Sequence, residues 1–200
     1  MDVTIVVGTF GHRKWIDLAH ERAIPSAVRQ EVPVIFRHED TLADARNEAI
    51  RAARTDWVIV LDADDELGEG YVQALGQAHG DLRAPALVEI LPDGLERQVD
   101  LTTRDMDSMN PCCIGTAIRR EMALDVGGFW PEPAWEDFSL FRRAWLIGAT
   151  IEHVPGAVYR ANVRPGSRNR VVRDPDALMA SIKRSHEDWM KERHRAATDT

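Results

Sequence analysis

The sequence has little cysteine and no long apolar run. Its only two cysteines, Cys112 and Cys113, are adjacent, and neighbouring cysteines rarely pair with each other without strain. No apolar stretch approaches the roughly 20 residues of a transmembrane helix, and the first residues form a strand pattern rather than a signal peptide. We therefore expect no disulfide framework, no membrane span and a cytoplasmic protein.

Basic residues are also in the minority. The chain has 25 Lys and Arg against 33 Asp and Glu, a formal net charge of −8, which argues against a nucleic acid or an anionic membrane as partner of the whole surface. The composition, 44% apolar and 29% charged, is that of a globular protein. Two hundred residues without repeats or low-complexity segments suit a single domain.

The most informative stretch is a buried strand that ends in acids. Trp57–Leu61 is apolar throughout, and Asp62, Asp64 and Asp65 follow directly. On an extended chain Asp62 and Asp64 point to one side, about 6–7 Å apart. A divalent cation would offset their repulsion, and Mg²⁺ and Mn²⁺ bind carboxylates while keeping positions open for phosphate oxygens. A solvated acidic turn that caps the next helix is the competing interpretation.

Two further strands end in polar loops. Val3–Val7 leads into Gly8-Thr9-Phe10-Gly11, and Pro33–Arg37 leads into His38-Glu39-Asp40. Open parallel sheets bind ligands at the carboxyl ends of their strands, so these loops and Asp62 could line one crevice. Taken alone, the loop Gly8-Thr9-Phe10-Gly11 is equally well explained as a plain strand-to-helix turn.

The helix after the second of these strands begins with a capping box, in which Thr41 is followed by Asp44. Arg46 and Asn47 lie in its second turn, off the apolar stripe or at its edge. An arginine in such a place is usually solvated. The alternative is that Arg46 reaches phosphates or carboxylates at the strand ends.

Three β-then-α units in the first 80 residues predict an α/β fold with a doubly wound, mostly parallel sheet and right-handed crossovers. The alternation stops near residue 95, which we interpret as a boundary between two lobes of one domain. The other elements that the pattern predicts are helices at 13–30 (split by Pro25), 68–79, 121–126 and from 174 onward, and strands at 84–91, 99–101, 112–118, 150–154 and 157–161.

A second acidic pair, Glu136 and Asp137, opens a helix after Trp135. The helix dipole favours acids in a first turn, but it does not explain the tryptophans and prolines crowded beside them. His153 lies in a predicted strand, where a histidine is more often a core residue than a ligand. From Arg160 to Arg173 there are five arginines and no acid. Such a basic segment predicts an anionic partner, which could be a diphosphate, the protein's own acidic residues or a nucleic-acid backbone.

In order and spacing these motifs resemble family 2 glycosyltransferases of the GT-A fold, over roughly residues 3–162. Thr9 follows the first strand, Ala45-Arg46-Asn47 precedes the acidic strand, and Leu61-Asp62-Ala63-Asp64-Asp65 is similar to the family's Asp-x-Asp motif. Gly127-Gly128-Phe129 then precedes Glu136-Asp137, followed by Arg142-Arg143 and Gly148.

The resemblance implies a metal-dependent, inverting transferase that moves a sugar from a nucleotide-diphosphate donor to an acceptor hydroxyl. Asp137 would be the general base with Glu136 beside it, and Asp64 and His153 would bind Mn²⁺ or Mg²⁺. The arginine segment would close over the diphosphate as a lid. The residues implied for donor and nucleotide binding are Thr9, Phe10, Glu39, Arg46, Asp62, Ala63, Arg168 and Arg170.

The resemblance also implies the partners. UDP is the commonest nucleotide of the family, and the acceptor would be a saccharide or a protein; the oligomeric state stays open. It divides the single domain into a nucleotide-sugar half (about 1–95), an acceptor and base half (96–162) and a basic loop with a C-terminal helix (163–200). Two alternatives remain: a non-catalytic nucleotide-sugar-binding or scaffold subunit of the same fold, and a nucleic-acid-binding module using the arginine segment, which the net charge of −8 makes unlikely.

Overall fold

The computed structural model describes residues 1–166 and 171–198. Within these residues the fold is built on one eight-stranded sheet. Seven strands are neighbours in the order β2-β1-β3-β7-β5-β8-β4, and the eighth, β6, pairs with β5. The strands are β1 Val3–Phe10, β2 Val34–Glu39, β3 Trp57–Leu61, β4 Glu66–Leu67, β5 Leu82–Ile90, β6 Glu96–Val99, β7 Ala117–Arg119 and β8 Ile151–Asn162.

The predicted α/β class with a mostly parallel sheet is confirmed. Strands β1, β2 and β3 pair in parallel. Because β7 is antiparallel to both β3 and β5, β5 runs in the direction of β3, and β8 pairs with β5 in parallel. Only the short strands β4, β6 and β7 run the other way within the described residues.

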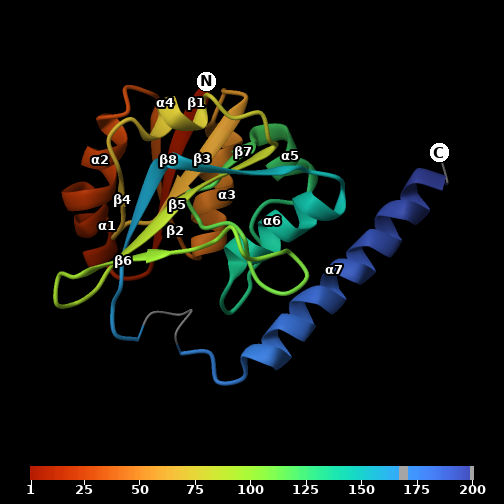
Figure 1. Cartoon of the computed structure of the whole chain (residues 1–200). Coiled ribbons are helices and arrows are strands. Elements are labelled where there is room, and N and C mark those ends of the chain that lie inside the picture. The colour runs from red at the N-terminus through yellow and green to blue at the C-terminus, as the bar shows by residue number, and fades with distance from the viewer. Residues whose placement is uncertain (167–170, 199–200) are drawn as a thin grey trace.

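Helices cover both faces of this sheet (Figure 1). The segment between β1 and β2 lies on one face, and α3, which connects β2 to β3, lies toward the other, together with α5 and α6. Right-handed crossovers that step in opposite directions along a sheet place their helices on opposite faces. The helices are α1 Lys14–Leu18, the π-helical η1 Ala19–Ala23, α2 Ile24–Val28, α3 Leu42–Ala52, α4 Tyr71–Leu75, α5 Arg120–Asp125, α6 Glu136–Leu146 and α7 Pro175–Thr198.

The first predicted helix is divided, as expected, near Pro25. Proline has no N–H to donate and its ring crowds the preceding turn. The chain accommodates it with a π-helical turn over Ala19–Ala23, and Pro25 then lies in the first turn of α2. The predicted capping box is also present, because the Asp44 N–H donates to the Thr41 hydroxyl at 3.1 Å.

Several predicted elements differ from those observed. The helix expected at 68–79 is only Tyr71–Leu75, and the strand expected at 112–118 is only Ala117–Arg119. The two strands expected at 150–154 and 157–161 are one strand, β8, with a bulge opposite Pro85 and Ala86 of β5. A bulge keeps a strand continuous while it bends, so Pro155-Gly156 does not end β8.

The long strand β8 and the long helix α7 close the fold. β8 runs beside the whole of β5, and its end pairs with Glu66 and Leu67 just after the acidic turn. α7 lies along the α6 side and extends beyond the body (Figure 1); Ile182 and His186 are its buried residues. No helix in the described part of the chain combines the length and apolar character needed to cross a bilayer.

Candidate active site

The candidate site begins at the acidic turn after β3. The strand ends at Leu61, and the Asp65 N–H donates to the Asp62 carbonyl at 3.1 Å, which closes a turn. The extended geometry that we expected for Asp62 and Asp64 is therefore wrong. A turn directs its side chains outward in different directions, and each acid here has a different partner.

Asp62 is joined to the start of α6 by a buried arginine. Arg46 of α3 donates to Asp62 Oδ1 at 2.5 Å and to Glu136 Oε1 at 2.8 Å, and its guanidinium lies 4.8 Å from the centre of the Phe129 ring. Burial lowers the pKa of Arg46, but the two carboxylates outweigh it and the pKa is raised. One side chain thus connects the acidic turn to the helix that carries the second acidic pair.

Of the two interpretations of Arg46, the solvated one is wrong and the one in which it reaches a carboxylate at a strand end is confirmed. Arg46 is 1% exposed, because α3 packs very close to β1. A Cβ placed on Gly8 of β1 would lie 3.0 Å from Arg46 Cγ and 3.1 Å from Arg46 N. Glycine at position 8 therefore allows α3 to pack this close to β1. From there the Arg46 side chain reaches Asp62 in the acidic turn.

Asn47 holds the segment before α6. Its side-chain amide donates to the Phe129 carbonyl at 2.9 Å and accepts from the Phe129 N–H at 2.7 Å. Gly128 has φ +66°, and a Cβ there would lie 2.3 Å from Asn47 Oδ1. The motifs Ala45-Arg46-Asn47 and Gly127-Gly128-Phe129 are thus one structural unit, a role for Asn47 that sequence reasoning missed.

Asp137 faces the cavity between these parts. Burial, followed by the neighbouring Glu136, raises the pKa of its carboxyl to about 7. The Asn110 side chain donates to Asp137 Oδ2 at 3.1 Å. A carboxylate that titrates near neutral pH is suited to accept a proton from a substrate hydroxyl.

Asp64 and Asp65 are held by the end of β8 and the residues after it. Arg164 Nε lies 3.0 Å from Asp64 Oδ2. Asp65 accepts from the Tyr159 hydroxyl at 2.8 Å and from the Asn162 N–H at 2.7 Å. Burial and the adjacent acids still raise the pKa of both carboxyls, Asp65 more strongly. Burial and mutual repulsion therefore outweigh the protein's own hydrogen bonds and cation, so the simultaneous ionisation of these acids is disfavoured unless a further cation binds.

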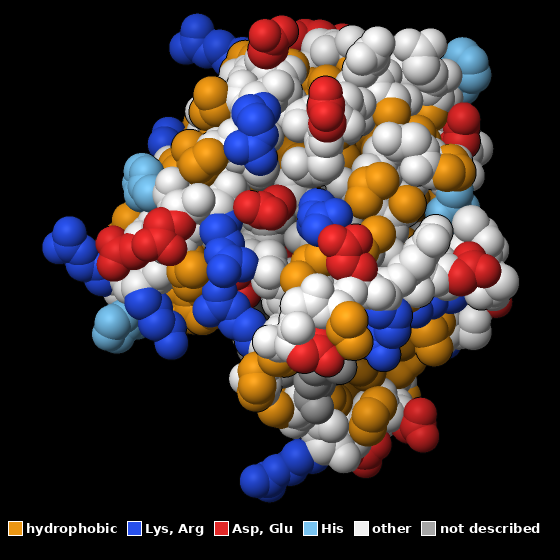
Figure 2. All heavy atoms as spheres, turned by 60° about the vertical axis from the view of Figure 1, so that its left-hand side comes forward, with side chains coloured by type: hydrophobic (Ala, Val, Ile, Leu, Met, Phe, Trp, Pro, Cys, Tyr) orange, Lys and Arg blue, Asp and Glu red, His pale blue; other side chains and the backbone are white. Residues whose placement is uncertain are grey.

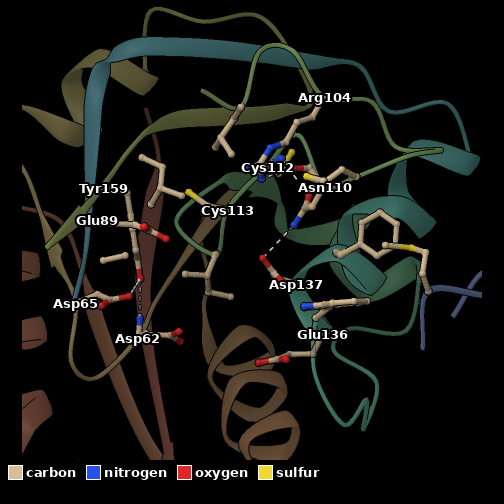
Figure 3. Close-up of a pocket in the computed structure, with 18 of the residues that line it drawn as sticks. Asp62, Asp65, Glu89, Arg104, Asn110, Cys112, Cys113, Glu136, Asp137 and Tyr159 are labelled. Carbon is tan, nitrogen blue, oxygen red and sulfur yellow. Dashed lines mark hydrogen bonds between the residues drawn. The ribbon is translucent and has the colours of Figure 1, made fainter. Parts of the chain in front are cut away.

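A cavity of about 540 Å³ joins the acidic turn to α6, within the size range of small-molecule sites. In Figure 3, Asp62, Asp65 and Tyr159 line one side and Glu136 and Asp137 the other. Asp64, to which the resemblance gave the metal ion of the same site as Asp137, is not part of this lining; it points to Arg164, which also lies near Trp15. Arg104, Met179 and the acids Glu89 and Asp176 also line the cavity.

The other predicted donor residues lie at neighbouring strand ends. Thr9 is buried at the end of β1, where its hydroxyl is 2.9 Å from His38 Nδ1, and Phe10 is the register partner of Glu39. Ala63 is buried in the acidic turn. Thr9, Phe10, Glu39 and Ala63 do not line the cavity itself. Arg168 and Arg170 lie outside the residues that the structure describes.

His153 is far from the acidic turn. It is the register partner of Ala84, whereas Asn162, which contacts Asp64 and Asp65, is the partner of Ile90. Six strand positions separate them, roughly 20 Å at about 3.3 Å per residue. Our expectation that His153 shares a metal with Asp64 is therefore wrong, because β8 is one continuous strand with His153 near its other end.

The acidic turn offers only part of a ligand set for a divalent cation. In residues 1–166 and 171–198, no group of three or more His, Cys, Asp or Glu side chains is arranged to hold a metal by itself. Metal ions that bridge diphosphates usually take only one or two protein carboxylates. Asp64, with its raised pKa, fits that role if Arg164 gives up its contact.

The geometry defines an α/β enzyme-like fold with its site at the carboxyl ends of parallel strands, and comparisons identify its class. The sequence profile described as "Glycosyl transferase family 2" matches residues 22–146, more than half of the chain. The chain therefore belongs to glycosyl transferase family 2. None of the curated protein sequences matches it.

Solved structures of glycosyltransferases share the fold. S. aureus TarS 1–349 in complex with UDP-GlcNAc superposes with a TM-score of 0.63 at 15% identity, over 93% of this chain and 65% of that one. GalNAc-T7 with UDP, GalNAc and Mn²⁺ gives a TM-score of 0.53 at 17% identity, over 84% of this chain and 46% of that one. The chain thus spans less than two thirds of the length of these structures, and at this identity the likeness concerns the fold, which is GT-A.

Sequence reasoning missed several residues that build the site. Tyr159 and Asn162 come from the end of β8, Arg164 lies two positions beyond it, and Asn110 comes from the irregular loop before β7. Only Arg164 carried a signal, as a member of the basic segment. The others are single polar residues whose importance comes from which strand lies beside which.

Proposed function

We propose that this protein is a metal-dependent, inverting glycosyltransferase that uses a nucleotide-diphosphate sugar. The observation that carries the proposal is that Asp62 and Asp137 line one cavity from opposite sides. One side offers carboxylates at parallel strand ends, where nucleotides bind in open α/β sheets. The other offers a carboxyl whose pKa burial raises to about 7.

Asp137 is the proposed general base. Of the two acids that open α6, Glu136 is paired with Arg46, whereas Asp137 faces the cavity and titrates near neutral pH. Ionised Asp137 would accept the proton of the acceptor hydroxyl as its oxygen attacks the anomeric carbon. Attack from the face opposite the leaving diphosphate inverts that carbon. Glu136 then acts through Arg46, holding it against Asp62.

Asp62 and Asp64 are the proposed residues of the donor side. Asp62 would contact the nucleotide, and Asp64 would hold Mn²⁺ or Mg²⁺. When bound, such a cation stabilises the negative charge that develops on the leaving diphosphate. Arg164 contacts Asp64 at 3.0 Å. Once a metal ion binds Asp64, the Arg164 guanidinium would be released from this contact and could pair with the diphosphate. Arg168 and Arg170 remain proposed contributors to the same basic segment.

UDP is the first nucleotide to test, because UDP and UDP-GlcNAc are the ligands named for the TarS structures. A saccharide or protein hydroxyl remains the proposed acceptor. The buried, free thiols of Cys112 and Cys113 suit a reducing compartment, and we propose that the protein acts in the cytoplasm. On the face in Figure 2, Lys and Arg side chains alternate with Asp and Glu, which does not favour a nucleic-acid partner.

Thermal unfolding with UDP, GDP and dTDP, each with and without Mn²⁺, tests donor binding. A ligand that binds only the folded state raises its stability by RT ln(1 + [L]/Kd). We expect one nucleotide to raise the Tm, and to do so more with Mn²⁺; the matching sugar nucleotide should be slowly hydrolysed. Asp64→Ala should lose the part of the Tm increase that depends on Mn²⁺. Asp137→Asn should bind the nucleotide as the wild type does but should not hydrolyse the sugar nucleotide.

Each result separates the candidate functions. Binding without any hydrolysis or transfer would favour the non-catalytic nucleotide-sugar-binding subunit. Near-normal turnover in Asp137→Asn would remove the proposed base. The absence of a Tm shift with all three nucleotides would contradict the proposed donor class.

A further inference from the structure

The side chain of Asn110 makes a contact with the proposed base that no motif predicted. Asn110 lies in the loop between β6 and β7, 27 positions before Asp137, and its Nδ2 donates to Asp137 Oδ2 at 3.1 Å. In Figure 3 the two side chains point directly toward each other, joined by this hydrogen bond. Both residues line the same cavity as Asp62.

The orientation of the Asn110 amide is fixed by the backbone that follows it. Its Oδ1 accepts the Cys112 N–H at 3.0 Å. Because the oxygen is used there, the NH₂ group is directed at Asp137. The amide can therefore donate to the carboxylate without first rotating.

The loop that carries Asn110 is tied down at several points. The Asp105 carboxylate accepts from the backbone N–H groups of Asp107 and Ser108, each at 2.9 Å. The Asp107 carbonyl accepts from Lys183 of α7, and the Asp107 carboxylate is 3.8 Å from Arg142 of α6. The loop is thus joined to α6, which also carries Asp137, so the two contacting residues share a support.

These contacts leave the Asp137 carboxylate partly free. Its known donors are the Asn110 amide and the N–H of Phe138, whereas a carboxylate has about four lone-pair positions. We infer that Asn110 is a positioning residue that holds Asp137 with a free lone pair directed at the acceptor hydroxyl. This inference rests on the proposed function, because it assigns a partner to the proposed base.

A donor to a carboxylate also favours its ionised form. The charged and titratable groups that act on Asp137 are Glu136 and Asp62, which raise its pKa, and Arg46, which lowers it; the thiols of Cys112 and Cys113 lie close as well. By this rule the Asn110 amide, which donates to Asp137 Oδ2, should act in the same direction as Arg46. Removing its amide should therefore raise the pKa of Asp137 further.

Two substitutions separate this role from that of a structural residue in a turn. Asn110→Ala removes both the donor to Asp137 and the acceptor for the Cys112 N–H. Asn110→Asp keeps the acceptor for Cys112 but replaces the donor with a second carboxylate. Thr103→Ala, an exposed polar residue of the same loop, is the matched control.

The first readout is the pKa of Asp137, followed by ¹³C-carboxyl NMR on aspartate-labelled protein and assigned with Asp137→Asn. We expect Asn110→Ala to raise it by about one pH unit. Asn110→Asp should raise it more, because two adjacent carboxylates disfavour each other's ionisation. Thr103→Ala should leave it unchanged.

The second readout is kinetic. If transfer is observed, kcat should fall roughly ten- to a hundredfold in both Asn110 variants, as for a misplaced catalytic group, while KM for the donor stays the same. The acid limb of the pH profile should move up with the NMR pKa.

The outcomes distinguish this inference from the proposed function. If Asn110→Asp behaves like the wild type in both readouts and only Asn110→Ala differs, the residue merely holds its turn and the inference is wrong. An unchanged pKa in both variants also overturns it. The NMR titration needs no turnover, so a shifted pKa in a protein that transfers no sugar would contradict the proposed function and leave the Asn110–Asp137 coupling established.

Discussion

Arg46 donates a hydrogen bond to Glu136 at 2.8 Å, although the two residues are 90 positions apart in the sequence. Through its second bond, to Asp62, the same guanidinium joins α3, the acidic turn and α6. The two halves of the cavity are therefore positioned by one buried ion network. The residues of this network, including Arg46 and Glu136, should therefore determine whether the site forms, in addition to the residues that would contact substrate.

Arg46→Met tests this network. The change leaves the carboxylates of Asp62 and Glu136 facing each other without their common cation. Losing one partner of a buried pair typically costs 3–5 kcal/mol; since the Asp62 side chain is 35% exposed, we expect about 2–4 kcal/mol from the free energy of unfolding. Urea denaturation measures the difference.

Arg51→Met is the matched control for this substitution. Arg51 lies on the same helix and pairs with Glu48, but both side chains are more than half exposed. Its removal should change the free energy of unfolding by less than about 0.5 kcal/mol. Equal costs for the two variants would mean that Arg46 contributes only as a surface charge.

The contact between Asn47 and the segment before α6 gives a second prediction. Gly128→Ala places a Cβ in the left-handed region, at φ +66°, and 2.3 Å from Asn47 Oδ1. Gly94→Ala has the same kind of backbone, at φ +83°, but nothing lies within 4 Å of the added atom. We expect Gly94→Ala to cost about 1 kcal/mol from backbone strain alone, and Gly128→Ala to cost clearly more.

The comparison isolates the steric part of the effect. A lower Tm in Gly128→Ala than in Gly94→Ala, with loss of nucleotide-dependent hydrolysis only in Gly128→Ala, would show that Asn47 needs the glycine. Indistinguishable variants would mean that the Asn47 contact can yield without cost.

The parts of this fold that follow local rules could be predicted from the sequence. The apolar run Trp57–Leu61, the capping box at Thr41 and the division of the first helix at Pro25 depend on neighbouring residues, and each is present. The sequence pattern predicted two strands in place of β8, because a Pro-Gly pair such as Pro155-Gly156 normally ends a strand. Only its pairing with β5, about 70 positions earlier, keeps it continuous.

The site was predictable only as far as its motifs. Asp62 and Asp137 lie on one cavity. The sequence left Arg46 open between solvent and the acids at the strand ends, because its helix stripe says nothing of how closely α3 approaches β1 at Gly8. His153 was placed with Asp64 by resemblance alone, and the register of β8 separates them. Asn110 has no local pattern at all, since its loop is positioned by contacts with α6 and α7.

The Arg164–Asp64 contact predicts competition with a divalent cation. Arg164→Ala removes the cation that occupies Asp64, so Mn²⁺ should bind more tightly in the absence of nucleotide. The pair is partly exposed, with side chains 34% and 20% accessible. Pairs of this kind contribute up to about 1 kcal/mol, which corresponds to at most about a fivefold change in Kd.

Mn²⁺ titration followed by electron paramagnetic resonance measures this affinity directly. Arg160→Ala, which removes an arginine that pairs with Glu96 instead, controls for the overall change of charge. Asp64→Ala should weaken Mn²⁺ binding in the same assay. An affinity that Arg164→Ala leaves unchanged, or that Arg160→Ala raises equally, would mean that Arg164 does not occupy the cation position.

The raised pKa of Asp137 predicts how stability depends on pH. Burial and Glu136 raise this pKa to about 7 in the folded protein, against about 3.9 in an unfolded chain. Between these values the folded state binds a proton that the unfolded state has released. The free energy of unfolding of the wild type therefore falls as pH rises from about 4 to about 7, through this group.

Asp137→Asn removes this contribution, because an amide does not titrate in this range. The stability of the variant relative to the wild type should increase from pH 4 to pH 7 and then stay constant, while transfer is lost at every pH. Asp188→Asn is the control with the opposite sign: a hydrogen bond from Lys191 lowers the pKa of Asp188, so its removal should cost a little stability above pH 4. Urea denaturation at pH 4.5, 6 and 8 gives both differences. A stability difference for Asp137→Asn that does not change with pH would mean that Asp137 ionises as it does in water, and an unperturbed carboxylate would be a much weaker base for a sugar hydroxyl.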